Sequence, residues 1–165
     1  MTSNEWKGLP TSSKQLIESY HDEFPVKVGE IAKKLGIKVN AATLPAHISG
    51  EIKEGDDGIV TIRVNRHDVK TRQRFTIAHE IAHFLLHRHL LNTGITDDVL
   101  YRSNQSDTIE KEANNLASDI LMPKKIVQLL IGKFSDEFKD DALYEKVAEE
   151  LGVSIIALKI CLNKK

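Results

Sequence analysis

The chain has little of what would place it outside the ordinary globular proteins. Its single cysteine, Cys161, excludes an internal disulfide, so we expect a reducing, cytoplasmic setting. No apolar run has the length of a bilayer-spanning helix, and the first ten residues lack the apolar segment of a signal peptide, so no membrane association is expected. The formal net charge is only −1, which gives no electrostatic reason to expect direct binding to nucleic acid.

What is present is an ordinary composition with clear local patterns. Apolar residues make up 41% of the 165 positions, enough for one domain with a core. The sequence predicts helices at 12–20 and 28–35, a strand at 37–44, a hairpin at 48–64, and helices at 70–89, 107–121 and, in two pieces, 142–162. Asp57-Gly58 marks the hairpin turn, Gly36 and Gly152 are helix stops, and Ser154 is a helix cap.

The order of these elements predicts the fold class. Helices come first, then strands, then mostly helices, which is typical of an α+β domain and not of an alternating α/β one. We expect one domain over 1–165, in which 124–165 form a helical C-terminal subregion. The polar stretch 91–106 is predicted to be an irregular loop between two helices.

One predicted helix contains residues that can bind a metal. His79-Glu80-Ile81-Ala82-His83 matches the pattern H-E-x-x-H. At about 100° per residue, His79 and His83 project from one face a turn apart, so both imidazoles can reach the same ion. Glu80 lies beside them, where it can accept a proton from a metal-bound water. The alternative is a chance match on an amphipathic helix with solvated histidines.

Catalytic zinc needs a third protein ligand, and later histidines are poor candidates. His89 has the spacing of the third histidine in a longer zinc pattern, but Leu86 stands where that pattern needs a turning glycine. His87 lies about 12 Å of helical rise from His79, too far to share one ion. We expect His87 to form a hydrogen bond at the far end of the cleft.

A carboxylate from the helix at 107–121 is the better candidate. Glu110 and Glu112 are about 200° apart on a helix, so only one of them can face the metal. Glu110 lies at the border of the apolar stripe, whereas Glu112 is predicted to point toward solvent, so we predict Glu110 as the ligand. Asn114, one turn on, is placed to hydrogen-bond a ligand histidine. Glu110 as a capping partner of Asp107, and Glu112 as the ligand, remain alternatives.

Two segments together resemble a known family. "RFTIAHEIAHFLLH" followed by "EKEANNLASDILMP" is similar to the paired motifs R-F-x-x-A-H-E-x-x-H-x-x-x-H and E-x-E-A-N-x-x-A-x-x-x-L-M-P of the ImmA/IrrE family of zincin-like metallopeptidases. The similarity runs from about Ile59 to Pro123. It implies a minimal zincin-like domain, in which a small twisted antiparallel or mixed sheet packs on the HExxH helix.

The resemblance also implies a site and an activity. It assigns one Zn²⁺ per chain to His79, His83 and Glu110, with Glu80 as the general base of a gluzincin-like metalloendopeptidase. Many members of the family are encoded beside a helix-turn-helix repressor, which they cleave or inactivate. The implied partner is therefore such a repressor, and the implied outcome is derepression of mobile-element or stress-response genes.

Two further expectations concern the substrate. Tyr101 and His87 are the candidates for stabilising the oxyanion that forms during peptide hydrolysis. The substrate is expected to lie extended along the strand at 59–65 or along its hairpin mate, where the backbone can pair with it.

A second class of function rests on the tail. "VAEELGVSIIALKICL" is similar to the turn and second helix of a helix-turn-helix, so the chain could instead be a non-proteolytic partner-binding or DNA-binding regulatory module. A recognition helix needs several outward basic or amide side chains, and the tail offers few of them. A helical lid or docking surface is therefore the favoured form of this alternative.

Overall fold

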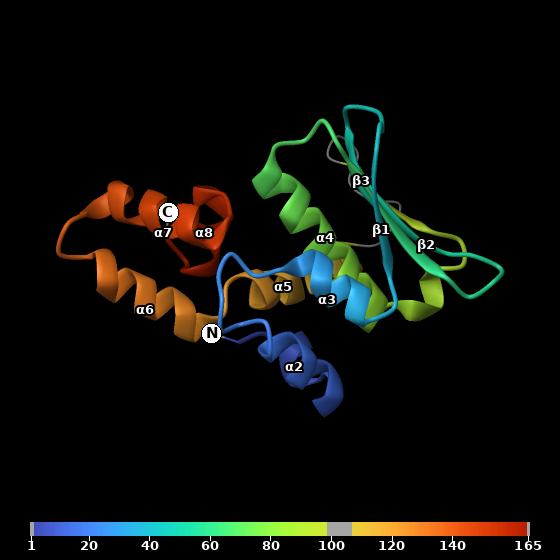
Figure 1. Cartoon of the computed structure of the whole chain (residues 1–165), viewed down its shortest axis with the longest axis horizontal. Coiled ribbons are helices and arrows are strands. Elements are labelled where there is room, and N and C mark those ends of the chain that lie inside the picture. Colours follow the sequence, from blue (N-terminus) through green and yellow to red (C-terminus); the bar gives the residue numbers. More distant parts are fainter. Residues whose placement is uncertain (1, 99–106, 165) are drawn as a thin grey trace.

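A computed structural model describes residues 2–98 and 107–164 (Figure 1). Its helices are α1 (Asn4–Lys7), α2 (Thr11–Glu18), α3 (Val28–Lys34), α4 (Lys70–Leu86), α5 (Asp107–Leu121), α6 (Lys124–Phe134), α7 (Asp140–Leu151) and α8 (Ile155–Cys161), with a 3-10 turn at Arg88–Leu90. Its strands are β1 (Lys38–Ala42), β2 (Ile48–Glu54), β3 (Val60–Asn65) and β4 (Ile95–Asp98). This order confirms the predicted α+β class.

The four strands form one mixed sheet in the order β1-β3-β2-β4. β1 runs parallel to β3, whereas β2 runs antiparallel to both β3 and β4. Both strands of the predicted hairpin therefore have neighbours on either side, and the prediction that a substrate pairs with one of them is wrong. The edges of the sheet belong to β1 and β4, and β4 itself lies inside the stretch predicted to be irregular.

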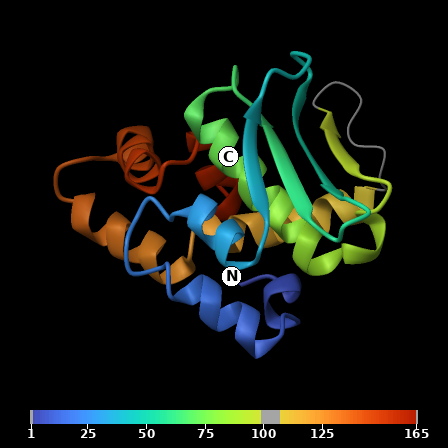
Figure 2. The ribbon, with the colours of Figure 1, turned by 45° about the vertical axis from the view of Figure 1, so that its right-hand side comes forward.

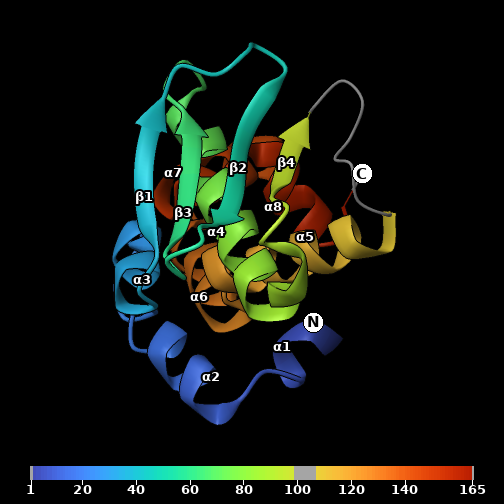
Figure 3. The same cartoon turned by 90° about the vertical axis from the view of Figure 1, so that its right-hand side faces the viewer.

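Helix α4 packs against one face of this sheet, and α5 packs along α4. In Figure 3 the sheet lies in front of α4, and Figure 2 shows the C-terminal helices on the side of α4 away from the sheet. Gly50 of β2 marks the closest approach, since a side chain there would collide with Thr76 of α4 and come within 2.9 Å of the Arg63 carbonyl oxygen. The core between these layers includes the fully buried Ile52, Ile62, Ile81, Leu116 and Ile120.

Several predicted helix ends are confirmed by their backbone geometry. Gly36 follows α3 with φ +79° and Gly152 follows α7 with φ +66°, both in the left-handed region that glycine adopts without strain. The Ser154 hydroxyl accepts a hydrogen bond from the Ala157 amide at 3.1 Å, as expected of a cap.

Helix α4 ends earlier than the sequence predicts. His87 leaves the helical conformation at φ −127°, ψ 35°, so the α-helix stops at Leu86 and a 3-10 turn replaces the predicted last turn. Among the described residues, none of the helices is long and apolar enough to cross a bilayer.

Candidate metal centre

The HExxH residues lie in the middle of α4, where the sheet covers one side of the helix and α5 the other. This placement buries them to an extent that is unusual for ionisable side chains: His79 is 2% exposed and Glu80 and His83 are 0% exposed. Groups buried in this way must interact with one another or with a ligand, because isolated buried charges are strongly disfavoured.

Glu110 of α5 faces the two histidines across the helix pair. Its Oε2 lies 3.2 Å from Nε2 of His79, and its Oε1 lies 3.2 Å from Nε2 of His83. The two Nε2 atoms are themselves 3.1 Å apart. The three predicted ligands therefore converge on one point. His79 and His83 come from successive turns of α4, and Glu110 comes from α5.

Hydrogen bonding leaves lone pairs at this point. Nδ1 of His79 lies 2.9 Å from Oδ1 of Asn114, and because an amide oxygen only accepts, Nδ1 donates and Nε2 is left as the acceptor in a neutral ring. Oε1 of Glu110 has no hydrogen-bond partner among the described residues. The centre thus brings ring nitrogens and a carboxylate together as electron-pair donors.

A small divalent cation fits this arrangement. Zinc binds histidine and carboxylate at about 2.0–2.2 Å, which places tetrahedral ligand atoms about 3.3–3.6 Å from one another. The observed separations of 3.1–3.2 Å are close to that spacing. A set of three nitrogen and oxygen donors is typical of catalytic zinc, whereas structural zinc normally has four protein ligands that are rich in cysteine.

The electrostatics of the centre reflect burial and close opposite charges. Burial lowers the pKa of His79, but its bond to Glu110 and the charges of Glu80 and Asp97 outweigh that effect and raise the pKa to about 9. Burial acts to raise the pKa of Glu110, yet the two adjacent histidines bring it below its ordinary value. For His83 burial dominates and lowers the pKa. The carboxylate of Glu110 is therefore ionised and available to a cation.

Glu80 differs from the ligand histidines because its side chain has no hydrogen-bond partner in the described part of the chain. Neither of its carboxyl oxygens has a hydrogen-bond partner among the described residues, and burial raises its pKa well above the ordinary value. Glu80 therefore has carboxyl oxygens that form no hydrogen bond with the described residues, next to His79, which is where a general base of the site would have to lie.

Asp97 is a residue of the centre that the sequence analysis missed. It lies on β4, and one of its carboxylate oxygens is within 4.8 Å of ligand atoms of both His79 and Glu80. Burial raises the pKa of Asp97. The only sequence signal was the short alternation in "ITDD", which is too brief to identify a strand.

His87 and Glu112 lie together beside the centre. Nε2 of His87 donates to Oε2 of Glu112 at 2.8 Å, and Nδ1 of His87 lies 2.9 Å from Nδ1 of His83. The prediction that Glu112 points into solvent is therefore wrong, although its side chain is 38% exposed. The reason is that α4 ends at Leu86, so His87 turns toward α5 and meets Glu112 there.

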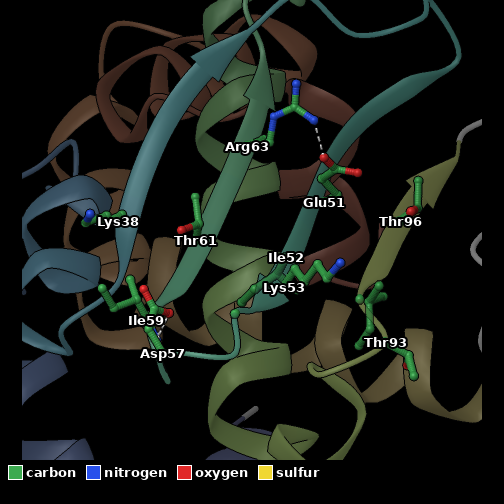
Figure 4. A pocket seen from close by; sticks show the side chains of 13 residues that line it. Lys38, Glu51, Ile52, Lys53, Asp57, Ile59, Thr61, Arg63, Thr93 and Thr96 are labelled. Atoms are coloured by element: carbon green, nitrogen blue, oxygen red, sulfur yellow. Dashed lines mark hydrogen bonds and ion pairs between the residues drawn. The ribbon is translucent and has the colours of Figure 1, made fainter.

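The structure joins neither of the two remaining candidates to the centre among the described residues. His89 is exposed in the 3-10 turn, away from the ligand set, and Tyr101 falls outside the described residues. A hollow of about 720 Å³ on the outer face of the sheet contains an ion pair between Arg63 and Glu51 (Figure 4). None of the HExxH residues lines this hollow.

An HExxH helix packed on a small mixed sheet and faced by a glutamate from a second helix defines a zincin-like metallopeptidase. Residues 32–163 match the model of peptidase family M78, described as the IrrE N-terminal-like domain. The chain therefore belongs to this family, the ImmA/IrrE group of metallopeptidases. A search of curated protein sequences found no significant match.

Proposed function

We propose that the chain is a zinc-dependent, gluzincin-like endopeptidase with one Zn²⁺ bound by His79, His83 and Glu110. The observation that supports this proposal is the convergence of three electron-pair donors next to Glu80, a buried carboxyl group without a hydrogen-bond partner among the described residues. Zinc bound there would polarise the scissile carbonyl and make a water molecule more acidic.

Glu80 performs the proton transfers in this proposal. It accepts the proton of the attacking water and then delivers it to the leaving amine, which keeps the step free of bulk solvent. The position of Glu80 supports this role, because it lies next to His79 and neither of its buried carboxyl oxygens has a hydrogen-bond partner among the described residues.

The substrate binds along β4 and not along the hairpin. β4 is an edge strand, with β2 on one side and no strand partner on the other among the described residues. Asp97 places this strand directly beside His79 and Glu80. An extended peptide that pairs with β4 through its backbone would bring a peptide bond over the centre, with little dependence on its side chains.

The physiological substrate in this proposal is a helix-turn-helix transcriptional repressor, whose cleavage or inactivation would derepress mobile-element or stress-response genes. Support for this target comes from the family to which the chain belongs. Selection of this protein substrate then depends on contacts with surfaces other than β4, since backbone pairing with a strand alone discriminates poorly among peptides.

A second candidate function, docking of a protein partner on the C-terminal helices, has an observation in its favour. Ile156 and Ile160 of α8 are each 69% exposed, and with Val69 and Phe75 they line a groove of about 380 Å³. Lys159 of the same helix forms an ion pair of 2.7 Å with Asp141. This apolar surface favours a protein partner over DNA.

Peptide-pool cleavage tests the proposed activity. The zinc-loaded parent chain and Glu80→Gln are incubated with a pool of peptides from a digested bacterial proteome, and new amino termini are counted by mass spectrometry. We expect cleavage by the parent and a loss of about 10²–10⁴-fold in rate for Glu80→Gln with its zinc content unchanged. Equal cleavage by both proteins, or none by the zinc-loaded parent, would contradict the proposal.

A further inference from the structure

His87 has no part in the proposed chemistry, yet its ring is buried and hydrogen-bonded on both sides. It is 4% exposed, and both of its ring nitrogens have a partner: His83 at 2.9 Å and Glu112 at 2.8 Å. Its backbone amide also donates to the His83 carbonyl oxygen at 2.8 Å. The ring is therefore fixed in place at the end of α4.

The chemistry of these contacts determines which atom carries each hydrogen. The carboxylate of Glu112 can only accept, so Nε2 of His87 carries a hydrogen and donates it. In a neutral ring, Nδ1 of His87 is then an acceptor. Nδ1 of His83 must therefore donate to it, which leaves Nε2 of His83 with a free lone pair.

That lone pair points at the metal centre. Nε2 of His83 is the atom that lies 3.1 Å from Nε2 of His79 and 3.2 Å from Glu110. The opposite arrangement, in which Nδ1 of His87 donates, would put the hydrogen of His83 on Nε2 and block it as a ligand. Helix α5 thus faces both ligand histidines: Asn114 contacts His79 directly, whereas Glu112 reaches His83 only through His87.

We propose that Glu112 and His87 are positioning residues, which hold His83 in the tautomer whose Nε2 is free to bind the cation. This inference rests on the proposed metal site, but it adds two residues that touch neither the ion nor the substrate. Hydrogen-bond partners of this kind fix the ring orientation of a ligand histidine, and their loss weakens metal binding by about 10–100-fold.

Zinc affinity is the first test, measured by competition with a chromophoric chelator. We expect His87→Phe and Glu112→Leu each to bind zinc about 10–100-fold more weakly than the parent chain. Glu112→Gln keeps an acceptor oxygen and should restore most of the affinity. Because both residues act on one ring, the double variant His87→Phe/Glu112→Leu should be no weaker than the worse single variant.

The matched control is Glu54→Leu. Glu54 pairs with Arg88 at 2.7 Å, one residue from His87, so this variant removes a carboxylate beside the same turn without touching a histidine. Its zinc affinity should equal that of the parent. Glu112→Leu keeps the test usable if His87→Phe does not fold, because the Glu112 side chain is 38% exposed.

The tautomer itself is visible by long-range ¹⁵N–¹H NMR of the metal-free protein. We expect the hydrogen of His83 on Nδ1 in the parent and in Glu112→Gln, and a mixture of tautomers in Glu112→Leu. A parent spectrum with the hydrogen on Nε2, or parent-like zinc affinity in both His87→Phe and Glu112→Leu, would overturn the inference. A parent chain that binds no zinc would instead defeat the proposed function.

Discussion

Two helix pairs of this molecule distribute polarity in opposite ways. The pair α4 and α5 buries ionisable side chains, with Glu80 and His83 fully inaccessible to solvent. The pair α7 and α8 exposes apolar ones, with Ile156 and Ile160 each 69% accessible. These particular side chains depart from the usual arrangement, in which charged groups face water and large apolar groups face the core, although both pairs also bury apolar side chains. The first pair thus brings together side chains that could bind a cation, whereas the second pair presents apolar side chains to solvent.

A side-chain hydrogen bond connects α4 to the turn between α7 and α8. Arg74 of α4 donates from Nε to the carbonyl oxygen of Gly152 at 3.1 Å, between α7 and α8. The guanidinium is partly buried, and burial lowers the pKa of Arg74. A charged group with few alternative partners therefore ties the C-terminal helices to the helix that contains the HExxH residues.

The largest expected effect on the free energy of unfolding comes from comparing the same substitution, isoleucine to alanine, in each helix pair. Ile81→Ala empties a fully buried position of α4 and should lower the free energy of unfolding by about 2–5 kcal/mol. Ile156→Ala removes a side chain that already faces water and should change it by less than about 0.5 kcal/mol. Urea denaturation of the two variants measures both values. Similar losses for the two would mean that α8 is buried in solution.

A smaller effect is expected at the turn between the pairs. Gly152→Ala places a side chain at φ +66°, with its Cβ 2.8 Å from Nε of Arg74, and should cost more than about 1 kcal/mol. Gly29→Ala is the control, because Gly29 lies in α3 with open space around it, and alanine there should stabilise the chain by about 0.5–1 kcal/mol. Thermal unfolding tests both, and an unchanged midpoint for Gly152→Ala would show that the turn is not held against Arg74.

The smallest expected effect concerns the beginnings of α8 and α4. Ser154→Ala removes the side-chain cap of α8 and should destabilise the chain by about 1 kcal/mol. Val69 occupies the N-cap position of α4 and provides no side-chain hydrogen bond, so Val69→Ser should stabilise the helix by up to about 1 kcal/mol. Chemical denaturation distinguishes the opposite signs. Destabilisation by Val69→Ser would mean that the Val69 side chain, although 71% exposed, stabilises the fold through its contacts in the groove beside α8 by more than the new cap does.

Local patterns made part of this structure predictable. The stops at Gly36 and Gly152, the cap at Ser154 and the turn at Asp57-Gly58 each depend on neighbouring residues alone, so the sequence contains the whole signal. The HExxH spacing belongs to the same class, because one turn of helix is enough to bring two histidines to one face.

Long-range contacts explain what the sequence did not reveal. Ile95–Asp98 becomes a strand only because β2 offers it a free edge, so Asp97 could not be placed beside Glu80 from its neighbours. The contact between His87 and Glu112 depends on the helix ending at Leu86, whereas the helical-wheel argument assumed a continuous helix. That argument served for Glu110 because α5 is regular around it.

In the proposed metal site, His79 and His83 of α4 and Glu110 of α5 bind one zinc ion. Zinc per chain, measured by elemental analysis after dialysis against a micromolar zinc buffer, tests it most directly in the parent, Glu110→Ala and Glu112→Ala. We expect about one zinc in the parent, none in Glu110→Ala, and a zinc ion still present in Glu112→Ala, though more weakly bound. A parent without zinc, or loss in Glu112→Ala with retention in Glu110→Ala, would contradict it.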